Sequence, residues 1–276
     1  MSAGQSLEAN INSAIELEPA AAEKLLDRKD MLFCCGYAAL ITIAEIIVGY
    51  GNIIIGMLVH AILLVAILAH SSLAGRDQSS KMLLTLALAP LTRMLSLAMP
   101  LGGIPIYYWY AVIGLPLILA TVTVARINGY KARDLGVNTV KIPLQLLFAL
   151  VGVGLGYIEY LILRPQPIIA PLTWTNILIP ALVLIIFTGF MEELAFRGVM
   201  QKAFSEGISQ KFSIIFVSYI FAVLHITHLR VLDIFFVFGV ALLFTYALKR
   251  LGSLLGITLA HGLTNIFLYA VWPNFY

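Results

Sequence analysis

A succession of nine long apolar stretches dominates this 276-residue chain and leaves few folds open to it. A helix needs about 20 apolar residues to cross the hydrocarbon core of a bilayer, and each stretch has roughly that length. With 61% hydrophobic and 11% charged residues, the chain is a polytopic membrane protein and not a water-soluble globule. The alternating stripes of an outer-membrane barrel are absent, so we predict an all-α bundle of about eight to nine transmembrane helices. The predicted spans are residues 31–49, 53–70, 82–99, 105–125, 143–163, 174–203, 211–227, 231–248 and 253–272.

The basic residues between the spans predict the orientation of the bundle. Thirteen of the 17 Lys and Arg residues fall in the N-terminal tail or in alternate connections, whereas the opposite connections hold only Arg164 and Arg230. Because cytoplasmic loops retain positive charge, we predict a cytoplasmic N-terminus and, with nine spans, an external C-terminus. The net charge of +3 follows from this topology, so we expect no nucleic-acid partner. The thirteen residues are Lys24, Arg28, Lys29, Arg76, Lys81, Arg126, Lys131, Arg133, Lys141, Lys202, Lys211, Lys249 and Arg250.

We divide the chain into three parts: a cytoplasmic segment (1–30), N-terminal transmembrane helices (31–126) and a C-terminal transmembrane core (127–276). The first part lacks the basic start, apolar core and cleavage site of a signal peptide, and residues 19–26 are expected to form a short helix. Cys34 and Cys35 lie side by side in the first span, where we expect packing and neither a disulfide nor a metal site. These features fit an integral protein of a prokaryotic plasma membrane.

The sixth apolar stretch contains three ionisable side chains, Glu192, Glu193 and Arg197. Near the centre of a membrane helix each costs roughly 2.5 to 3.5 kcal/mol, so together they oppose insertion by about 7 to 10 kcal/mol. The nine strongly apolar residues before them return only about 3 to 5 kcal/mol. Other parts of the protein must therefore hold these charges, and a function is the expected reason for keeping them.

Two more polar positions occur inside apolar spans: His225, and the pair His261 and Asn265. At 1.5 Å per residue from the predicted cytoplasmic ends, Glu192 lies about 17 Å deep, His225 about 21 Å and His261 about 12 Å. All three depths fall around the middle of the bilayer. We therefore predict that residues from three helices converge there.

Helical spacing indicates how these groups divide their roles. Glu193 and Arg197 are four residues apart in the favourable order for an ion pair, whereas Glu192 points about 100° away and is left free. A carboxylate in a low-dielectric site can act as a general base toward water. His261 and Asn265 are also four apart, so they share one helical face and can present two N–H donors to one oxygen, as an oxyanion hole does.

The first half of the chain carries few ionisable residues inside its spans. They are Glu45, His60 and Arg93, with Glu159 just past the midpoint. We expect Arg93 to form a structural ion pair with Glu45 or Glu159, without a role in catalysis. Embedded histidines such as His60 and His228 are expected to be packing residues.

Pairs of glycines spaced four residues apart occur twice in the apolar spans. Gly152 with Gly156, and Gly252 with Gly256, have the small-xxx-small spacing that lets helices approach closely, so we predict close helix packing at both.

Three short motifs carry a family resemblance: Glu192-Glu193-x-x-x-Arg197, Phe221-x-x-x-His225 and His261-x-x-x-Asn265. They occur in this order, each in an apolar span, and resemble the motifs of the CPBP (ABI) family of intramembrane proteases, which includes the type II CAAX prenyl endopeptidases. Residues 133–136 (RDLG) and 252–256 (GSLLG) also resemble family segments. The resemblance covers roughly residues 130–272.

The resemblance implies an intramembrane endopeptidase that uses a water molecule activated by Glu192, with His225 positioning or relaying the proton. It implies that His261 and Asn265 stabilise the oxyanion. It also implies membrane-associated peptide substrates, among them prenylated C-terminal CAAX peptides of lipidated proteins, in contact with membrane lipids. Supporting roles are implied for Glu193, Arg197 and Phe221.

Two alternatives stay open at this point. Two histidines and two carboxylates can bind zinc, but His-Glu-x-x-His is absent and asparagine is a poor zinc ligand, so we favour a reaction without cofactor or metal. The protein can instead be a non-catalytic binding, immunity or scaffold member of the family, or a proton-coupled transporter, since buried Glu, His and Arg also build proton relays.

Overall fold

The computed structural model describes residues 28–75, 77–99 and 102–276. These residues form helices, turns and loops without a β-strand, which confirms the predicted all-α class. Nine helical segments in this part of the chain are long and apolar enough to span a membrane, in agreement with the predicted spans. The short helix predicted over residues 19–26 lies outside the described residues. The nine segments are Lys29–Tyr50, Ile53–Leu73, Gln78–Ala98, Ile106–Ile127, Ile142–Leu163, Trp174–Gly207, Gln210–His228, Val231–Leu251 and Leu254–Asn274.

Several of these segments are divided into shorter elements. The first five contain α2 (Arg28–Tyr50), α3 (Ile53–Leu73), α4 (Gln78–Leu86), α5 (Leu88–Ala98), α6 (Ile106–Ile127), α7 (Ile142–Ala149) and α8 (Val151–Leu163), with the 3₁₀ turn η1 (Ala132–Leu135) before α7. The last four contain α9 (Trp174–Leu184), η2 (Ile185–Phe190), η3 (Glu193–Met200), α10 (Gln201–Gly207), α11 (Gln210–Val223), η4 (Ile226–His228), α12 (Val231–Leu251), α13 (Leu254–Ile266), η5 (Phe267–Val271) and η6 (Trp272–Asn274).

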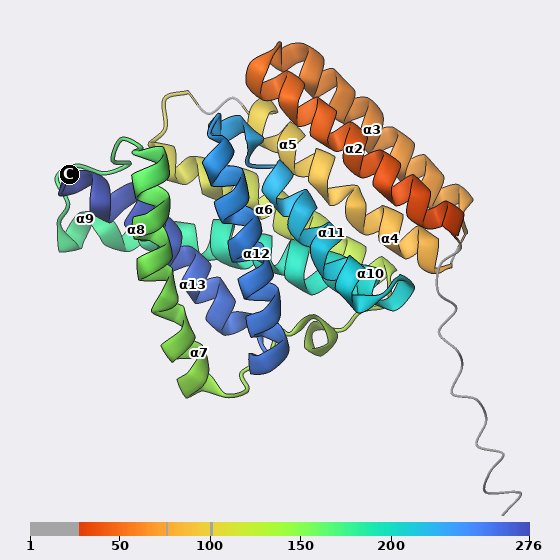
Figure 1. Cartoon of the computed structure of the whole chain (residues 1–276). Helices are drawn as coiled ribbons and strands as arrows, with labels where there is room; N and C mark the ends of the chain where they lie inside the picture. Colours follow the sequence, from red (N-terminus) through yellow and green to blue (C-terminus); the bar gives the residue numbers. More distant parts are fainter. Residues whose placement is uncertain (1–27, 76, 100–101) are drawn as a thin grey trace, which may run out of the picture.

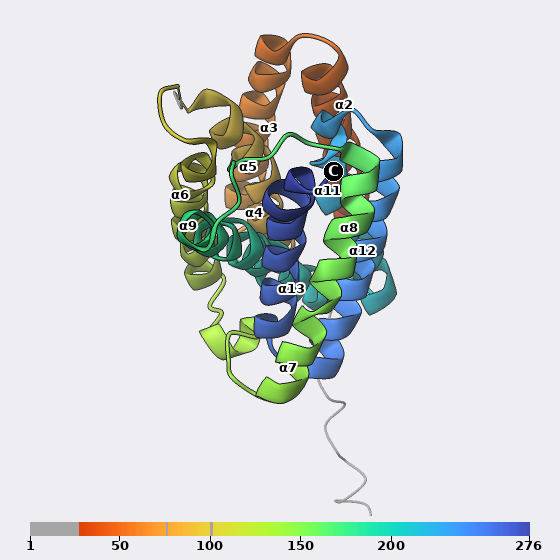
Figure 2. The ribbon, with the colours of Figure 1, turned by 90° about the vertical axis from the view of Figure 1, so that its left-hand side faces the viewer.

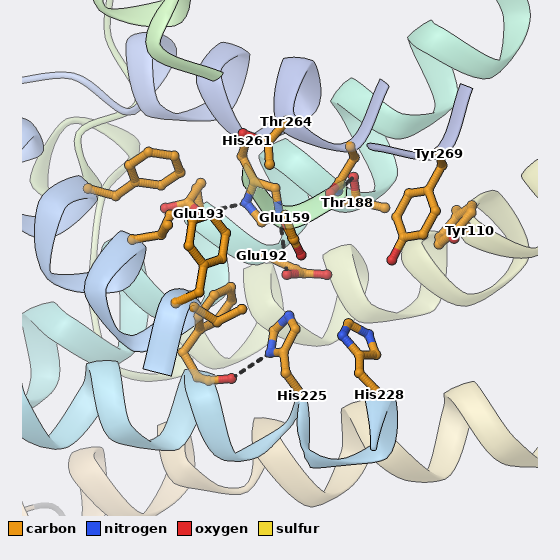
Figure 3. A pocket seen from close by; sticks show the side chains of 16 residues that line it. Tyr110, Glu159, Thr188, Glu192, Glu193, His225, His228, His261, Thr264 and Tyr269 are labelled. Atoms are coloured by element: carbon orange, nitrogen blue, oxygen red, sulfur yellow. Dashed lines mark hydrogen bonds and ion pairs between the residues drawn. The ribbon is translucent and has the colours of Figure 1, made fainter. Parts of the chain in front are cut away.

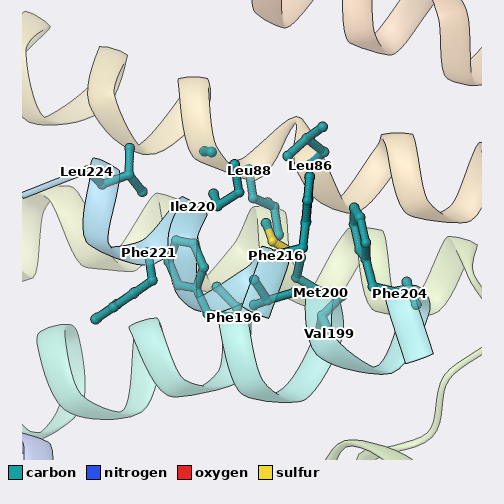
Figure 4. Packing of buried hydrophobic residues seen from close by; sticks show 14 of the residues in the cluster. Leu86, Leu88, Phe196, Val199, Met200, Phe204, Phe216, Ile220, Phe221 and Leu224 are labelled. Carbon is teal, nitrogen blue, oxygen red and sulfur yellow. The ribbon is translucent and has the colours of Figure 1, made fainter. Parts of the chain in front are cut away.

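The bundle has two flanks that meet at a shared core. α2 and α3 lie side by side at one flank with α4 and α5 beside them (Figure 1), and α13 lies amid η2, α7 and α8 on the other (Figure 2). Between the flanks, large apolar side chains of η3, α10 and α11 pack against the junction of α4 and α5 (Figure 4). Phe204 and Phe216 stack there with ring centroids 4.7 Å apart. This core fixes α11, which ends beside the candidate site.

The sixth span is 34 residues long, much more than a bilayer crossing requires. Two of its segments, η2 and η3, are π-helical. Such segments, with i→i+5 hydrogen bonds, are rare and often occur at functional sites. They flank Met191 and Glu192, and Glu193 is the first residue of η3, so both carboxylates of the first motif lie where the two π-helical segments meet.

Polar side chains at helix ends explain where several spans begin and end. Asn52, Thr173 and Ser253 accept hydrogen bonds from the first backbone N–H groups of α3, α9 and α13. Gly252 ends α12 in the left-handed conformation, with φ 77°, which glycine adopts at little cost. Gly252 and Gly256 therefore belong to different elements, and the predicted close packing is wrong for Gly252. It is confirmed for Gly256, where a Cβ atom would lie 3.1 Å from the Cα atom of Gln145 in α7.

Gly152 and Gly156 do let two helices pack closely, as predicted. A Cβ atom at Gly152 would collide with the carbonyl oxygen of Ala260, and one at Gly156 would lie 2.6 Å from the carbonyl oxygen of Thr264. Both carbonyls belong to α13, so α8 and α13 approach backbone to backbone. This contact fixes the helix that carries the third motif.

The loop after η1 docks on the start of α13. The carbonyl oxygen of Gly136 accepts a hydrogen bond of 2.8 Å from the N–H of Leu254, and the Ser253 hydroxyl donates one of 2.6 Å to the carbonyl oxygen of Asn138. The two further segments that resemble the family, residues 133–136 and 252–256, therefore contact each other.

The two cysteines of the first span differ in their surroundings. Cys34 is buried, as predicted for a packing residue, whereas Cys35 is exposed on the surface of α2. The packing prediction is wrong for Cys35 because neighbouring residues on a helix point in directions about 100° apart.

The predicted structural ion pair of the first half is present. The Nη2 atom of Arg93 lies 2.8 Å from Oε2 of Glu45, and Nε2 of His60 lies 3.3 Å from Oε1 of the same carboxylate. This confirms the pairing with Glu45. The alternative partner, Glu159, faces a cavity on the other flank.

Candidate active site

A cavity of about 190 Å³ lies where α6, α8, η2, η3, α11, α12 and α13 meet (Figure 3). It collects side chains from all three motifs, although they come from helices far apart in the sequence. The convergence predicted from the depths of the spans is therefore confirmed. The predicted site residues that line the cavity are Glu192, Glu193, Phe221, His225, His261 and Asn265.

Glu193 is the most enclosed member of the site, with a fully buried side chain. Its Oε1 atom lies 3.2 Å from Nη1 of Arg197, which confirms the predicted ion pair, and 2.7 Å from Nδ1 of His261. The guanidinium carbon of Arg197 also lies 4.0 Å from the ring centroid of Phe221. Glu193 thus links the first motif to the third, while Arg197 packs on the aromatic ring of the second.

Glu192 faces the cavity instead of this ion pair. Its Oε2 atom lies 3.7 Å from Nε2 of His261, and 24% of its side chain is exposed, against none for Glu193. The imidazole of His261 therefore lies between the two carboxylates, with one ring nitrogen toward each. Glu192 is the carboxylate that a water molecule or substrate in the cavity can reach.

His225 lies at the end of α11, where the chain leaves the helix. Its Nδ1–H donates a hydrogen bond of 2.9 Å to the carbonyl oxygen of Phe221. In a neutral imidazole this leaves Nε2 as an acceptor. The ring projects toward Glu192 across the cavity (Figure 3), so a proton acceptor and a carboxylate share one space.

Asn265 is oriented by a residue of η2. Its Nδ2–H donates a hydrogen bond of 2.9 Å to the hydroxyl of Thr188, which in turn donates to the carbonyl oxygen of Leu184. The second N–H of the amide is not used in this pair. His261 and Asn265 both line the cavity, but the ring nitrogens of His261 face carboxylates, so their joint action on one oxyanion stays a prediction.

The cavity contains polar residues that the sequence did not single out for the site. Thr188 is four residues before Glu192, a spacing that could have indicated it. Glu159 was expected to be structural, although its position inside a span was a signal of function. His228, expected to be a packing residue, lines the cavity and places Nδ1 2.7 Å from Oδ2 of Asp233. No sequence signal marked the remaining three, Tyr110, Thr264 and Tyr269.

A metal centre would require several of these side chains to point at one position. Among the residues that the structure describes, no group of three or more His, Cys, Asp or Glu side chains is arranged to hold a metal ion. The carboxylates of the site are arranged instead around His261 and Arg197.

Comparisons with known proteins bear on the same segment. Residues 174–267 match the model of the family described as type II CAAX prenyl endopeptidase Rce1-like. The match begins later than the resemblance predicted, with α9, and ends at the start of η5. It contains all seven motif residues and leaves the N-terminal helices outside. Neither curated proteins nor solved structures gave a match. The match confirms the predicted resemblance to CAAX-type membrane proteases over residues 174–267.

Proposed function

We propose that this protein is an intramembrane endopeptidase that hydrolyses a peptide bond with a water molecule activated by Glu192. The observation that carries the proposal is the division between the two carboxylates. Glu193 is bound by Arg197 and His261, whereas Glu192 faces a cavity at membrane depth. A partly enclosed carboxylate without an arginine partner is suited to general base catalysis.

In the proposed reaction, water enters the cavity between Glu192 and His225. The carboxylate of Glu192 takes a proton as the water oxygen attacks the scissile carbonyl carbon, and Nε2 of His225 accepts a hydrogen bond from the same water. The C–N bond then breaks, and the proton passes from Glu192 to the leaving nitrogen. Proton transfer of this kind contributes about 100- to 10,000-fold to a rate.

The negative charge that develops on the carbonyl oxygen must be stabilised by hydrogen-bond donors. We propose that the free amide N–H of Asn265 supplies one, with Thr188 holding the amide in place. His261 supplies a second when its Nε2 carries a proton. Preorganised donors of this type are each worth about 100- to 1,000-fold in rate.

The substrate class follows from the walls of the cavity. α12 contributes an apolar wall, and the position inside the bilayer favours a peptide that the membrane already holds. We therefore propose membrane-associated peptides as substrates, among them prenylated C-terminal CAAX peptides. The apolar side chains of this wall are Phe236, Val237, Val240 and Phe244.

The test is cleavage of a panel of fluorogenic peptides, prenylated and unprenylated, by detergent-purified protein. Glu192→Ala and His261→Ala should abolish cleavage while the proteins stay folded. Glu206→Ala is the matched control, because this glutamate lies at the end of the sixth span, away from the cavity, in a partly exposed pair with Lys202. A Glu192→Ala protein that cleaves like the wild type would refute the mechanism.

The same panel of peptides, together with an uptake assay in liposomes, distinguishes the proposed function from its alternatives. A requirement for the prenyl group would assign the CAAX class, and loss of activity with chelators that zinc restores would replace the metal-free reaction with a zinc-dependent one. A folded protein that cuts no peptide but retains one would support a binding role, and proton-driven uptake in liposomes would support a transporter.

We also propose that the N-terminus is cytoplasmic and that the protein resides in a prokaryotic plasma membrane. Arg133 and Gln166 are exposed in connections on opposite sides of the bundle. With Cys34 and Cys35 replaced by serine, a membrane-impermeant thiol reagent applied to intact cells should label Gln166→Cys and not Arg133→Cys. The reverse pattern would invert the topology.

A further inference from the structure

A second cluster of ionisable side chains lies outside the cavity and outside the segment that matches the family. Glu45 of α2 and His60 of α3 are fully buried, and Arg93 of α5 is 9% exposed. The Nε–H of Arg93 lies 2.9 Å from both oxygens of Glu45, which adds to the shorter contact through Nη2. The carboxylate thus fixes the guanidinium in one orientation.

The guanidinium of Arg93 has a further partner on α11. Its Nη2–H donates a hydrogen bond of 2.5 Å to the carbonyl oxygen of Leu224, the residue at the C-terminal end of that helix. Carbonyls of a last helical turn have no partner within their helix, and the helix dipole places negative charge there. Arg93 therefore supplies a donor and a positive charge at the end of α11.

The residue after Leu224 is His225, and the chain changes direction there. His225 has φ −98° and ψ 2°, outside the helical geometry of α11. The N–H of His228 bonds the carbonyl oxygen of His225 at 3.0 Å, which begins the 3₁₀ turn η4. Because this turn sets the backbone from which the imidazole projects, the hold on Leu224 bears directly on where His225 points (Figure 3).

α2 contacts the same turn. A Cβ atom at Gly49 would lie 3.2 Å from Cδ2 of Leu229 and 3.5 Å from the carbonyl oxygen of Ile226. Leu224 itself packs in the core that joins α11 to the junction of α4 and α5 (Figure 4). The N-terminal helices thus surround the turn through backbone, apolar and ionic contacts.

We propose that Arg93, held by Glu45, is a positioning residue for His225. It caps α11 from a helix of the N-terminal half and holds the turn from which the imidazole faces the cavity. The proposal rests on the proposed role of His225 in hydrolysis. By this proposal the N-terminal helices, which lie outside the segment that matches the family, contribute to the reaction by positioning His225.

The test uses the full-length protein and the variant Arg93→Lys. A lysine keeps the positive charge beside Glu45 but has a single nitrogen, which cannot bind the carboxylate and the carbonyl of Leu224 as the guanidinium does. Ser71→Ala is the control, because its buried hydroxyl bonds Ser80 and joins α3 to α4. Amide hydrogen exchange of residues 225–229 is measured first, since it does not depend on catalysis.

We expect Arg93→Lys to speed exchange at residues 225–229 about tenfold or more and Ser71→Ala to leave it unchanged. In the cleavage assay, Arg93→Lys should lower kcat about 10- to 100-fold with little change in KM. In a His225→Ala background the same substitution should cost nothing further, since its effect passes through His225.

Unchanged exchange at residues 225–229, or an equal loss of kcat with and without His225, would overturn the positioning role. These outcomes differ from failure of the proposed function, which shows as full cleavage by Glu192→Ala. In that event the exchange measurement still decides whether Arg93 holds the turn.

Discussion

Two buried clusters of this protein use the same three residue types and differ in what surrounds them. In the N-terminal half, Glu45 is enclosed with Arg93 and His60. In the C-terminal half, Glu193 is enclosed with Arg197 and His261. In both, a glutamate holds an arginine and lies beside a histidine.

The difference is that the second cluster borders a cavity and has a second carboxylate on its open side. The imidazole of His261 reaches Glu192 as well as Glu193, whereas the carboxylate of Glu45 is closed in by its partners. A buried ion pair alone therefore says little about catalysis. A reactive site also needs a group that its neighbours leave available to water.

The largest expected difference concerns the two carboxylates. Glu192→Gln should lower kcat about 100- to 10,000-fold and leave the fold intact, because the amide cannot take a proton from water. Glu45→Gln should lower kcat no more than Arg93→Lys does, since the carboxylate of Glu45 acts on the site only through Arg93. Peptide cleavage with purified, folded variants measures both. Equal losses would mean that the two clusters do not differ in role.

The next comparison removes each arginine. Arg197→Ala and Arg93→Ala should each cost about 3 to 5 kcal/mol of stability, because each leaves a buried carboxylate without its cation. Unfolding in detergent, followed by helical circular dichroism, measures the loss. A cost below about 1 kcal/mol for either would show that its carboxylate finds another partner or is neutral.

The histidines should separate the clusters by activity instead of stability. His261→Gln is expected to lower kcat about 100-fold or more, because it breaks the contact between the two glutamates of the site. His60→Gln should leave kcat within about tenfold of wild type, since His60 reaches Leu224, the residue before His225, only through Glu45 and Arg93. Steady-state kinetics on both variants decides, and a larger loss for His60→Gln would reverse the assignment.

The smallest effect is expected at the surface. Lys202 and Glu206 have the same four-residue spacing as Glu193 and Arg197, with their charged groups 3.0 Å apart, but their side chains are 38% and 28% exposed. Lys202→Gln should cost only about 0.2 to 0.5 kcal/mol, because solvent screens the pair. If Lys202→Gln lowers the unfolding midpoint as far as Arg197→Ala does, then the spacing of the two residues, and not their burial, sets how much each ion pair contributes to stability.

Much of the site could be predicted because helix geometry is regular. The rise per residue placed Glu192, His225 and His261 at similar depths, and the four-residue spacing predicted the pair of Glu193 with Arg197. The position of Glu159 could not be assigned, because its span offers several faces and the sequence does not say which neighbour each face meets. The orientation of Asn265 toward Thr188 likewise depends on how α13 crosses η2.

The sequence by itself determined the membrane class, the spans and the candidate site residues, because these depend on hydrophobic length and on local spacing along one helix. The tertiary structure decided which of two similar clusters borders a cavity, that His261 lies between Glu193 and Glu192, and that Arg93 reaches the end of α11. These are contacts between helices distant in sequence. Such contacts follow from crossing angles and close backbone approaches, which packing of the whole bundle sets.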